Sequence, residues 1–529
     1  MKKMKKVLAV LLTLAMVLGM SMTTLAATAP KSNDAAPARV YGVEAGASVT
    51  AYQIVKGTYN ANGLIGYEKA NENLEIEDVK APTYDEIMAI AAEINTKINN
   101  ESPVGLESKP MTRATDSAFY EANLETGYWI VLVRGTGDTI YNPMLVGVYY
   151  TIAEESGDNI LFAGEVRATD RWTIDATHSV AKSTTTTITK TADVETQKTG
   201  GDVNFTVETV VPDYSTEYTE ILFEVSDTLT NLTLKQVDNN IKVYAGTNAE
   251  VKAGTATLIS TENYVLTQGN NNKSFTIDFD DEWILLNGTQ SITITYTATL
   301  DKAALNEIPG KNYVELHYTN NPGVHDGKKW DEEKVYSFIL DVFKKVGEGE
   351  ETAALVGAEF TLYTDEECKT IYVNDQFEGK VTSGTDGRMA INGLDVGTYY
   401  LKETNAPAGY TINPTVYRIV IDATINGEEI VSWTITTSEV AKQTNEETNE
   451  EITTYINEVT NTYTVRNSNE GVQVTVNDGE STDVVIANTK LLSLPSTGGI
   501  GTTIFTIAGC MIMIAAAAMF IISRRKEAK

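Results

Sequence analysis

Most of the chain alternates between apolar and polar residues, in short runs separated by turn residues. Runs such as "VNFTVETVV" and "SITITYTATL" are rich in Thr, Val, Ile and Tyr. A period of two predicts β-strands that bury one face, and these residue types are enriched in strands. The pattern therefore predicts an all-β protein built from tandem β-sandwiches of immunoglobulin-like type.

One stretch, "PTYDEIMAIAAEINTKINN", has helical spacing instead. Its isoleucines recur every three or four residues, at positions 87, 90, 94 and 98. Thr83 and Glu86 form a capping-box signature at its start. The sequence therefore predicts a single short amphipathic helix, located in the N-terminal domain.

The two ends of the chain have compositions of their own. Residues 1–29 begin with lysines, continue as an apolar run and end in small residues, which is typical of a secretory signal peptide. Residues 500–522 are almost entirely apolar and long enough to span a bilayer. Arg524, Arg525 and Lys526 follow at once, which favours a cytoplasmic tail. We therefore expect a C-terminal transmembrane helix and an exported exterior.

A length of 529 residues leaves room for about three domains. We expect an N-terminal domain at 30–182, a middle domain at 183–328 and a C-terminal domain at 329–490. Residues 491–529 form the terminal anchor segment. The polar stretch 438–471 is expected to form an exposed hairpin or insertion within the C-terminal domain.

Charge and cysteine content narrow the possible partners and the means of stabilisation. The net charge is −31, although both ends are basic, so the exterior repels nucleic acid. Only two cysteines occur, Cys368 and Cys510, and the second lies in the apolar terminal run. An exported protein often relies on disulfides, but this exterior cannot form one internally.

In three strands of the C-terminal domain, a polar residue falls on the face that alternation assigns to the core. Lys344 follows Leu340 and Val342, while Glu403 and Asn488 continue apolar faces elsewhere. Burial lowers the pKa of a lysine and raises that of a carboxylic acid. Such a lysine could attack the asparagine amide while the acid transfers protons, leaving a neutral crosslink and ammonia. From alternation alone, a buried ion pair beside a hydrogen-bonded asparagine is an open alternative.

The middle domain repeats this arrangement. Lys190 comes two residues after Ile188, Asp227 continues the apolar face of "ILFEVSD", and Asn312 opens the apolar face of "NYVELHY". Glu224 is a poor substitute for the acid, because it lies on the opposite face of its strand.

The C-terminal segments closely resemble a known domain family. "LDVFKKVGEGEETAALVGAEFTLY", "GLDVGTYYLKETNAPAGY" and "VVIANTK" resemble the Cna B-type domain of sortase-assembled Gram-positive pilins. The resemblance implies an intramolecular isopeptide bond between Lys344 and Asn488, with Glu403 as its acid. Lys345 is a poorer nucleophile, because it shares a face with Asp341.

The other two domains also resemble parts of pilins. The middle segment is similar to the middle domain of major pilins of the Spa type. This similarity implies a second isopeptide bond between Lys190 and Asn312, with Asp227 as its acid. The first domain resembles the pilin N-terminal domain in "VTAYQIVKGTYNANGLIGYEKA", and it contains no convincing third set. The two bonds would replace disulfides as covalent staples.

The hexapeptide "LPSTGG", followed by the apolar run and the basic tail, resembles an LPxTG sorting signal. Leu494 and Pro495 begin the motif. The resemblance implies that a sortase cleaves between Thr497 and Gly498 and holds the chain as an acyl-enzyme at Thr497. A plain stop-transfer anchor would explain the apolar run but not the motif.

Pilin backbones carry an acceptor lysine in a motif of Trp, spaced Val residues and "YPK" at the end of the first domain. "WTIDATHSVAK" occupies that place, with Trp172 and Lys182, but "YPK" is absent and the spacing is one residue longer. The resemblance implies that Lys182 is the acceptor, and a solvated linker lysine is the alternative. Alternation would turn Lys182 inward with Trp172, so we expect the strand to end or bulge before the lysine.

These features predict the structural backbone subunit of a pilus, secreted and covalently anchored to a Gram-positive cell wall. The implied partners are copies of itself, a class C-type pilus sortase, a housekeeping sortase, tip and base minor pilins, and peptidoglycan. No cofactor or metal is expected. The alternative is a monomeric wall-anchored adhesin or basal minor pilin. A surface enzyme is disfavoured, because His178, His317 and His325 lack metal-binding spacing and no cysteine nucleophile has a partner.

Overall fold

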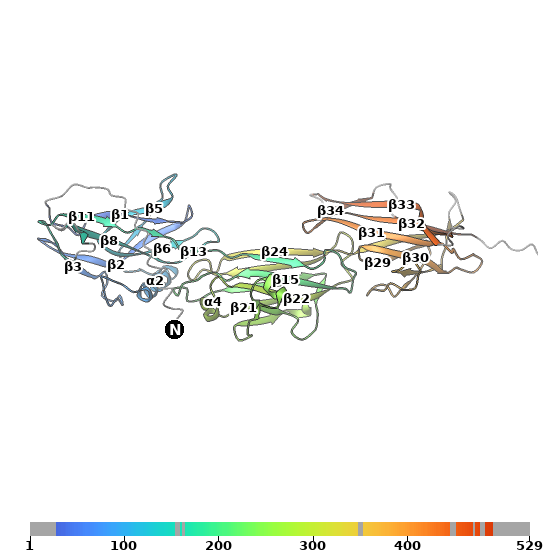
Figure 1. Cartoon of the computed structure of the whole chain (residues 1–529), viewed down its shortest axis with the longest axis horizontal. Coiled ribbons are helices and arrows are strands. Elements are labelled where there is room, and N and C mark those ends of the chain that lie inside the picture. The colour runs from blue at the N-terminus through green and yellow to red at the C-terminus, as the bar shows by residue number, and fades with distance from the viewer. Residues whose placement is uncertain are drawn as a thin grey trace, which may run out of the picture. The chain divides into compact units, whose positions relative to one another are not determined.

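The computed structural model describes residues 28–153, 159–160, 164–347, 353–444, 451–468, 471–476 and 482–489. The chain forms β-rich domains, as the alternation predicted (Figure 1). It divides into two compact units. The first unit extends to residue 336, apart from residues 305–307, and contains the first and middle domains. The second unit begins at Ser337 and is the third domain.

The first domain is built around a large sheet in which neighbouring strands do not follow the order of the chain. Its strands run β10-β3-β2-β6-β8-β11, with β4 added to β2 and β9 added to β8. A smaller sheet, β12-β1-β5, covers one face, and β13 pairs with β7 near the end of the domain. The bounds are β1 (Ala35–Tyr41), β2 (Ser48–Asn60), β3 (Gly63–Lys69), β4 (Ser108–Pro110), β5 (Phe119–Glu125), β6 (Gly127–Arg134), β7 (Ile140–Tyr141), β8 (Met144–Ala153), β9 (Asn159–Ile160), β10 (Val166–Arg167), β11 (Trp172–Ala176), β12 (Ser179–Val180) and β13 (Ser183–Thr184).

The expected helix is α2 (Tyr84–Asn99), and it covers the other face of the large sheet. Thr83 is its N-cap and forms the predicted capping box with Glu86. Its isoleucines pack against Ile54 and Ile130 of the sheet. The helical spacing therefore placed both the start and the buried face correctly.

The middle domain is a sandwich of two antiparallel sheets, β14-β15-β22-β18-β19 with β17 added to β22, and β20-β21-β16-β23-β24. The bounds are β14 (Ile188–Ala192), β15 (Asp202–Val210), β16 (Phe223–Thr230), β17 (Leu232–Leu234), β18 (Lys242–Ala245), β19 (Thr257–Leu258), β20 (Tyr264–Gln268), β21 (Ser274–Phe279), β22 (Ser291–Leu300), β23 (Gly310–Tyr318) and β24 (Gly327–Val335).

Two findings correct the sequence-based expectations for this domain. It contains two short helices, α3 (Asn248–Ala253) and α4 (Asp281–Leu286), and a 3₁₀ turn at Asn270–Asn272. The helix of the first domain is therefore not the only one. In addition, β24 pairs with β23 along its whole length, so residues 329–336, expected in the third domain, complete the middle sandwich. Val335 accordingly lies in the middle core.

The third domain is a second sandwich, with sheet β26-β25-β29, to which β35 is added beside β25, facing β28-β27-β30-β31-β32-β33-β34. The bounds are β25 (Phe338–Val346), β26 (Ala353–Ala354), β27 (Glu359–Tyr363), β28 (Lys380–Thr382), β29 (Arg388–Leu394), β30 (Gly397–Asn405), β31 (Val416–Asn426), β32 (Glu429–Thr444), β33 (Glu451–Ser468), β34 (Gly471–Val476) and β35 (Val484–Asn488). The stretch 438–471 belongs largely to the β32–β33 hairpin, as expected.

The signal peptide, the sorting motif and the apolar terminal run lie outside the described residues, apart from the last two residues of the predicted signal peptide. Among the residues that are described, no helix is long and apolar enough to cross a membrane.

Candidate functional site

The three polar residues predicted in the third-domain core come together from three strands. Lys344 on β25 and Asn488 on β35 belong to one sheet, where the two strands run parallel and side by side. Glu403 comes from β30 of the facing sheet, next to Phe360 of β27. All three side chains are buried. The alternation that assigned them to the core is therefore confirmed by their burial.

The contacts within this set join all three groups. Lys344 Nζ donates to Asn488 Oδ1 at 2.6 Å and lies 3.4 Å from Glu403 Oε2. Asn488 Nδ2 donates to Glu403 Oε1 at 2.8 Å. Each carboxylate oxygen thus faces one of the two nitrogen groups, and the amine touches the amide directly.

The surroundings shift the Lys344 amine toward its neutral form. Burial lowers the pKa of Lys344 to about 8, although the carboxylate of Glu403 opposes this shift. The ring of Phe360, 5.2 Å from Nζ, forms one wall of the site. Lys345, the neighbouring lysine, is not buried with it, so only Lys344 has this environment.

A residue that the sequence reasoning missed holds the acid in place. The Asn413 backbone N–H donates to Glu403 Oε2 at 2.7 Å, and its side-chain Nδ2 donates to the carbonyl of Ala487 at 3.2 Å. Asn413 thereby ties the acid to β35, the strand that carries Asn488. Its position in a loop after "ETNAPAGY" gave no periodic signal that could have revealed it.

In the middle domain the three predicted residues are also buried together. Lys190 on β14 projects from one sheet, and Asp227 on β16 and Asn312 on β23 project from the facing sheet. Lys190 Nζ forms an ion pair with Asp227 Oδ2. Asn312 lies on β23, the penultimate strand of this domain, because β24 completes the sandwich.

A fourth residue, Tyr296 on β22, joins this set. Its hydroxyl donates to Asp227 Oδ2 at 2.6 Å and accepts from Asn312 Nδ2 at 2.9 Å. Asp227 Oδ1 and Asn312 Oδ1 are buried without a hydrogen-bond partner among the described residues. Tyr296 was missed because a tyrosine on an alternating apolar face is indistinguishable from an ordinary core residue.

Burial shifts both charged groups of the middle domain toward their neutral forms. It lowers the pKa of Lys190 and raises the pKa of Asp227, and in each case the partner's charge opposes the shift. Two neutral groups avoid the cost of burying charge in an apolar core.

Lys182 lies between β12 and β13, so the strand ends before it, as expected. Its side chain is 59% exposed, and Nζ pairs with Asp213 Oδ2 of the middle domain at 2.8 Å. Trp172 makes separate contacts: its ring meets Tyr150 edge-on, and its indole N–H donates to the carbonyl of Thr28. Trp172 and Lys182, the two residues of the expected acceptor motif, therefore contact different parts of the structure.

The segment that carries Asp213 also holds an unusual acid, Glu217. Its side chain is buried, and neither carboxylate oxygen has a hydrogen-bond partner among the described residues. Burial raises its pKa to about 7. Glu217 resembles Asp227 and Glu403 in burial, but within the described part of the chain no lysine forms an ion pair with it.

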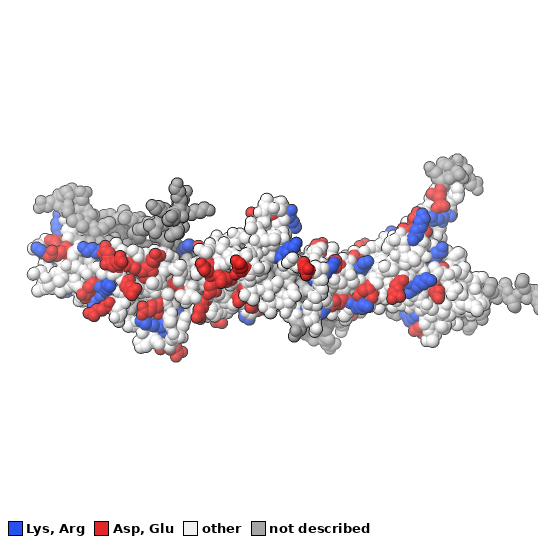
Figure 2. All heavy atoms as spheres, turned by 90° about the horizontal axis from the view of Figure 1, so that it is seen from below, with Lys and Arg blue, Asp and Glu red and all other residues white. Residues whose placement is uncertain are grey.

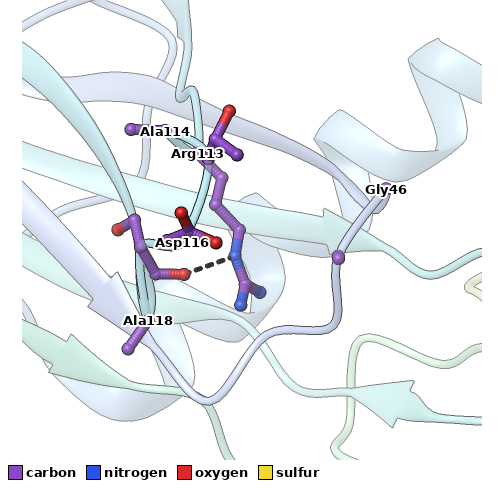
Figure 3. Close-up of a pocket in the computed structure, with 8 residues that line it drawn as sticks. Gly46, Arg113, Ala114, Asp116 and Ala118 are labelled. Atoms are coloured by element: carbon purple, nitrogen blue, oxygen red, sulfur yellow. Dashed lines mark hydrogen bonds between the residues drawn. The ribbon is translucent and has the colours of Figure 1, made fainter.

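A hollow of about 570 Å³ lies in the first domain between residues 45–46 and 113–118 (Figure 3). The Arg113 guanidinium points across it, but donates to the main-chain carbonyls of Ser117 and Val43 at 2.8 Å. Arg113 therefore connects the loop at residues 113–118 to the main chain at Val43. On the face shown in Figure 2, acidic side chains cover more of the surface than basic ones, although the two kinds are interspersed.

Family models match the first domain, much of the third domain and the C-terminal anchor segment. Residues 33–183 match the T6 antigen Ig like domain, residues 342–436 match the prealbumin-like fold domain, and residues 488–529 match the LPXTG cell wall anchor motif. The sorting motif lies in the last of these ranges.

A curated relative extends the similarity along the whole chain. The trypsin-resistant surface T6 protein of Streptococcus pyogenes serotype M6 is 28% identical over 563 aligned residues, covering 96% of this chain and 98% of that protein. The solved structure of the T6 backbone pilin of serotype M6, described as a modular three-domain structure, has a TM-score of 0.59 at 21% identity. The structural match covers 88% of this chain and 100% of the T6 pilin chain.

The structural likeness shows that this chain has the same overall fold as that structure. The domain matches, the anchor motif and the full-length relative together support a secreted, cell-wall-anchored pilus protein that serves as a structural backbone subunit.

Proposed function

We propose that the chain is a pilus backbone subunit joined to its neighbours by a sortase, from Thr497 of one subunit to Lys182 of the next. We further propose that each of the middle and third domains contains an internal Lys–Asn isopeptide bond. The observation that carries the proposal is the pair of buried Lys–acid–Asn sets, one in each domain. Such bonds would increase the resistance of a fibre to unfolding under tension, because the pulling force would pass through covalent bonds.

In the third domain the neutral amine of Lys344 attacks the side-chain carbonyl carbon of Asn488. A C–N bond forms, the bond from that carbon to Nδ2 breaks, and Nδ2 leaves as ammonia. One proton passes from Nζ to the leaving nitrogen through Glu403, which contacts both nitrogens. The enclosure of the three groups in a folded core supplies the proximity that this reaction needs.

The middle domain would perform the same exchange between Lys190 and Asn312, with Asp227 as the acid. Both reactions occur once on the chain itself, so neither acid is an enzyme's active-site residue in the usual sense. Each bond would close a loop of more than 100 residues, which stabilises a domain by roughly 5 kcal/mol in the chain-entropy account.

The link between subunits uses the exposed lysine. The sortase would cleave after Thr497 and hold the threonine carbonyl as an acyl-enzyme. Lys182 would leave its ion pair with Asp213, lose a proton and attack that carbonyl, releasing the enzyme and forming an amide. The exposure of Lys182 supports this role, since a buried amine could not reach a second protein.

The proposed partners follow from this chemistry. A class C-type pilus sortase would join copies of the chain, and a housekeeping sortase would transfer the finished fibre to peptidoglycan. Tip and base minor pilins would complete the assembly.

The test is the pattern of covalent polymers in the presence of a pilus sortase. Wild type should give a ladder of high-mass species on denaturing gels, and Lys182→Ala should abolish it. Lys235→Ala is a matched control, because Lys235 is also a partly exposed lysine paired with an aspartate, Asp202, in the middle domain. A ladder that persists in Lys182→Ala would overturn the acceptor assignment. A single wall-linked species in wild type would favour a monomeric adhesin or basal pilin.

A further inference from the structure

The hydroxyl of Tyr296 stands between the acid and the amide of the middle domain. It donates to Asp227 Oδ2 at 2.6 Å and accepts from Asn312 Nδ2 at 2.9 Å. The ring is buried and packs against Phe205 and Phe275, with ring centroids 5.6 and 5.0 Å apart. A phenylalanine would provide this packing equally well, so packing does not explain the hydroxyl.

The register of the sheet explains why something must bridge this gap. Asp227 lies opposite Val314 on the neighbouring strand, and Asn312 lies opposite Leu229. Acid and asparagine are therefore diagonal neighbours, which in antiparallel sheets are roughly 7–8 Å apart. An aspartate side chain is short for that span, and the Asn312 amide nitrogen contacts Tyr296 instead.

The third domain provides the contrast. Glu403, which is one methylene longer, contacts the amine and the amide of its own set directly. In the middle domain, Asp227 contacts the amine of Lys190, and Tyr296 completes the path to the amide. Asp227 and Tyr296 together thus connect the amine to the amide in the middle domain, a connection that Glu403 makes alone in the third domain.

We propose that Tyr296 is a catalytic residue of the middle-domain crosslink, passing a proton between Asp227 and the departing amide nitrogen of Asn312. This inference rests on the proposed function, since it concerns the same bond. As the Lys190 nitrogen bonds to the Asn312 side-chain carbon, the bond from that carbon to Nδ2 breaks. Tyr296 gives its hydroxyl proton to Nδ2, which leaves as ammonia, and takes up the carboxyl proton of Asp227. The lysine nitrogen then gives one proton to the Asp227 carboxylate, which restores the acid. No other reactant is needed.

Two buried oxygens without hydrogen-bond partners are consistent with an Asp227 side chain that carries a proton before the reaction starts. Asp227 Oδ1 and Asn312 Oδ1 are both acceptors when the acid is ionised, and neither has a donor among the described residues. A proton on Asp227 would supply the missing donor for this buried region, where unsatisfied polar atoms are costly. The same proton is the one that the relay requires.

The experiment follows both crosslinks in one molecule over time. The full-length chain is synthesised in a cell-free system, samples are denatured at intervals, and the joined peptide pairs Lys190–Asn312 and Lys344–Asn488 are quantified by mass spectrometry after digestion. The third-domain crosslink serves as an internal clock for synthesis and folding. The variant is Tyr296→Phe, which retains the ring.

Tyr214→Phe is the matched control. Tyr214 is a buried tyrosine of the same domain whose hydroxyl donates to the carbonyl of Thr319 at 2.8 Å, away from the Lys190 set. We expect Tyr296→Phe to slow the middle-domain crosslink about 100-fold, a typical contribution of a proton-transfer group. Tyr214→Phe should leave both crosslinks at the wild-type rate.

Equal rates of middle-domain crosslinking in Tyr296→Phe and Tyr214→Phe would overturn the relay. Circular dichroism and limited proteolysis check that the middle domain of Tyr296→Phe is folded. If it is not, 3-fluorotyrosine at position 296 retains the hydroxyl and changes its acidity. In that case a rate that differs from wild type supports the relay, and an unchanged rate overturns it. A wild-type chain that never joins Lys190 to Asn312 would instead refute the proposed function for this domain, and the relay with it.

Discussion

The middle and third domains arrange the same three residue types in two different ways. In the third domain the lysine and the asparagine lie on neighbouring strands of one sheet, and the acid reaches them from the facing sheet. In the middle domain the acid and the asparagine share a sheet, and the lysine reaches across the core from the facing sheet to pair with the acid. One proposed bond would fasten two strands of a sheet, and the other would fasten two sheets to each other.

If the proposed bonds form in both domains, the chemistry requires that the three groups lie close together and does not require one particular strand topology. What changes with topology is how the acid reaches the amide. Glu403 reaches it directly, whereas Asp227 depends on the hydroxyl of Tyr296. A different strand arrangement can therefore support the same reaction, provided that a hydroxyl group connects the acid to the amide that the acid does not reach directly.

The largest expected effect comes from removing the asparagines. Asn312→Ala and Asn488→Ala each abolish one bond and leave the lysine–acid pair in place. We expect the free energy of unfolding of the affected domain to fall by roughly 5 kcal/mol, the loop-closure value for a loop of this size. Calorimetry measures the loss, and intact mass verifies that each variant lacks one crosslink. Unfolding transitions that match wild type in both variants would contradict the idea of staples.

Glu217 tests what a buried acid costs when no amine accompanies it. Burial raises its pKa from 4.5 to about 7, so the folded state holds a proton that the unfolded state releases at lower pH. Stability should therefore fall as the pH rises from about 4.5 to 7 and stay lower above that range.

Glu217→Gln removes this dependence. At pH 8 we expect it to stabilise the first unit by about 3 kcal/mol, at 1.36 kcal/mol for each unit of pKa shift, and at pH 4 to change little. Thermal unfolding at pH 4, 6 and 8 provides the comparison. A glutamine variant whose advantage is the same at all three pH values would contradict the ionisation argument.

The pH dependence of crosslinking tests the third-domain amine. Asn488 lies on the last strand of its domain, so a chain that ends at residue 481 can be mixed with a peptide of residues 482–489. Because the pKa of Lys344 is about 8, most of the amine is protonated at lower pH. The rate should rise about tenfold per pH unit up to that pKa and then level off. A flat profile from pH 6 to 9 would show that deprotonation of the amine does not limit the reaction.

The smallest expected effect is that of Lys345→Ala, one residue from the proposed nucleophile. Lys345 is not buried, and its loss should change the free energy of unfolding by less than about 0.5 kcal/mol. The mass should still show the third-domain crosslink. A missing crosslink in this variant would mean that Lys345, and not Lys344, is the nucleophile.

The sequence predicted the parts of the site that follow from periodicity. Alternation placed Lys344, Asp227 and Asn312 on buried faces, since a strand with one apolar face leaves little choice. It could not reveal Tyr296, whose type fits any core, or Asn413, which lies in a loop.

The domain boundary after residue 328 was misplaced for a related reason. β24 (residues 327–335) is mostly charged, buries only Gly327 and Val335, and pairs with β23 at the edge of its sheet. A strand at a sheet edge resembles a linker when its partner is not known. The two short helices of the middle domain were missed because neither is long enough to show helical periodicity.

The most direct test of the central claim is the intact mass of the exported part of the chain, followed by peptide mapping. We predict a mass lower than the sequence value by two molecules of ammonia, with one joined pair at Lys190 and Asn312 and the other at Lys344 and Asn488. A mass equal to the sequence value, with all four residues recovered in unjoined peptides, would contradict the account for both domains.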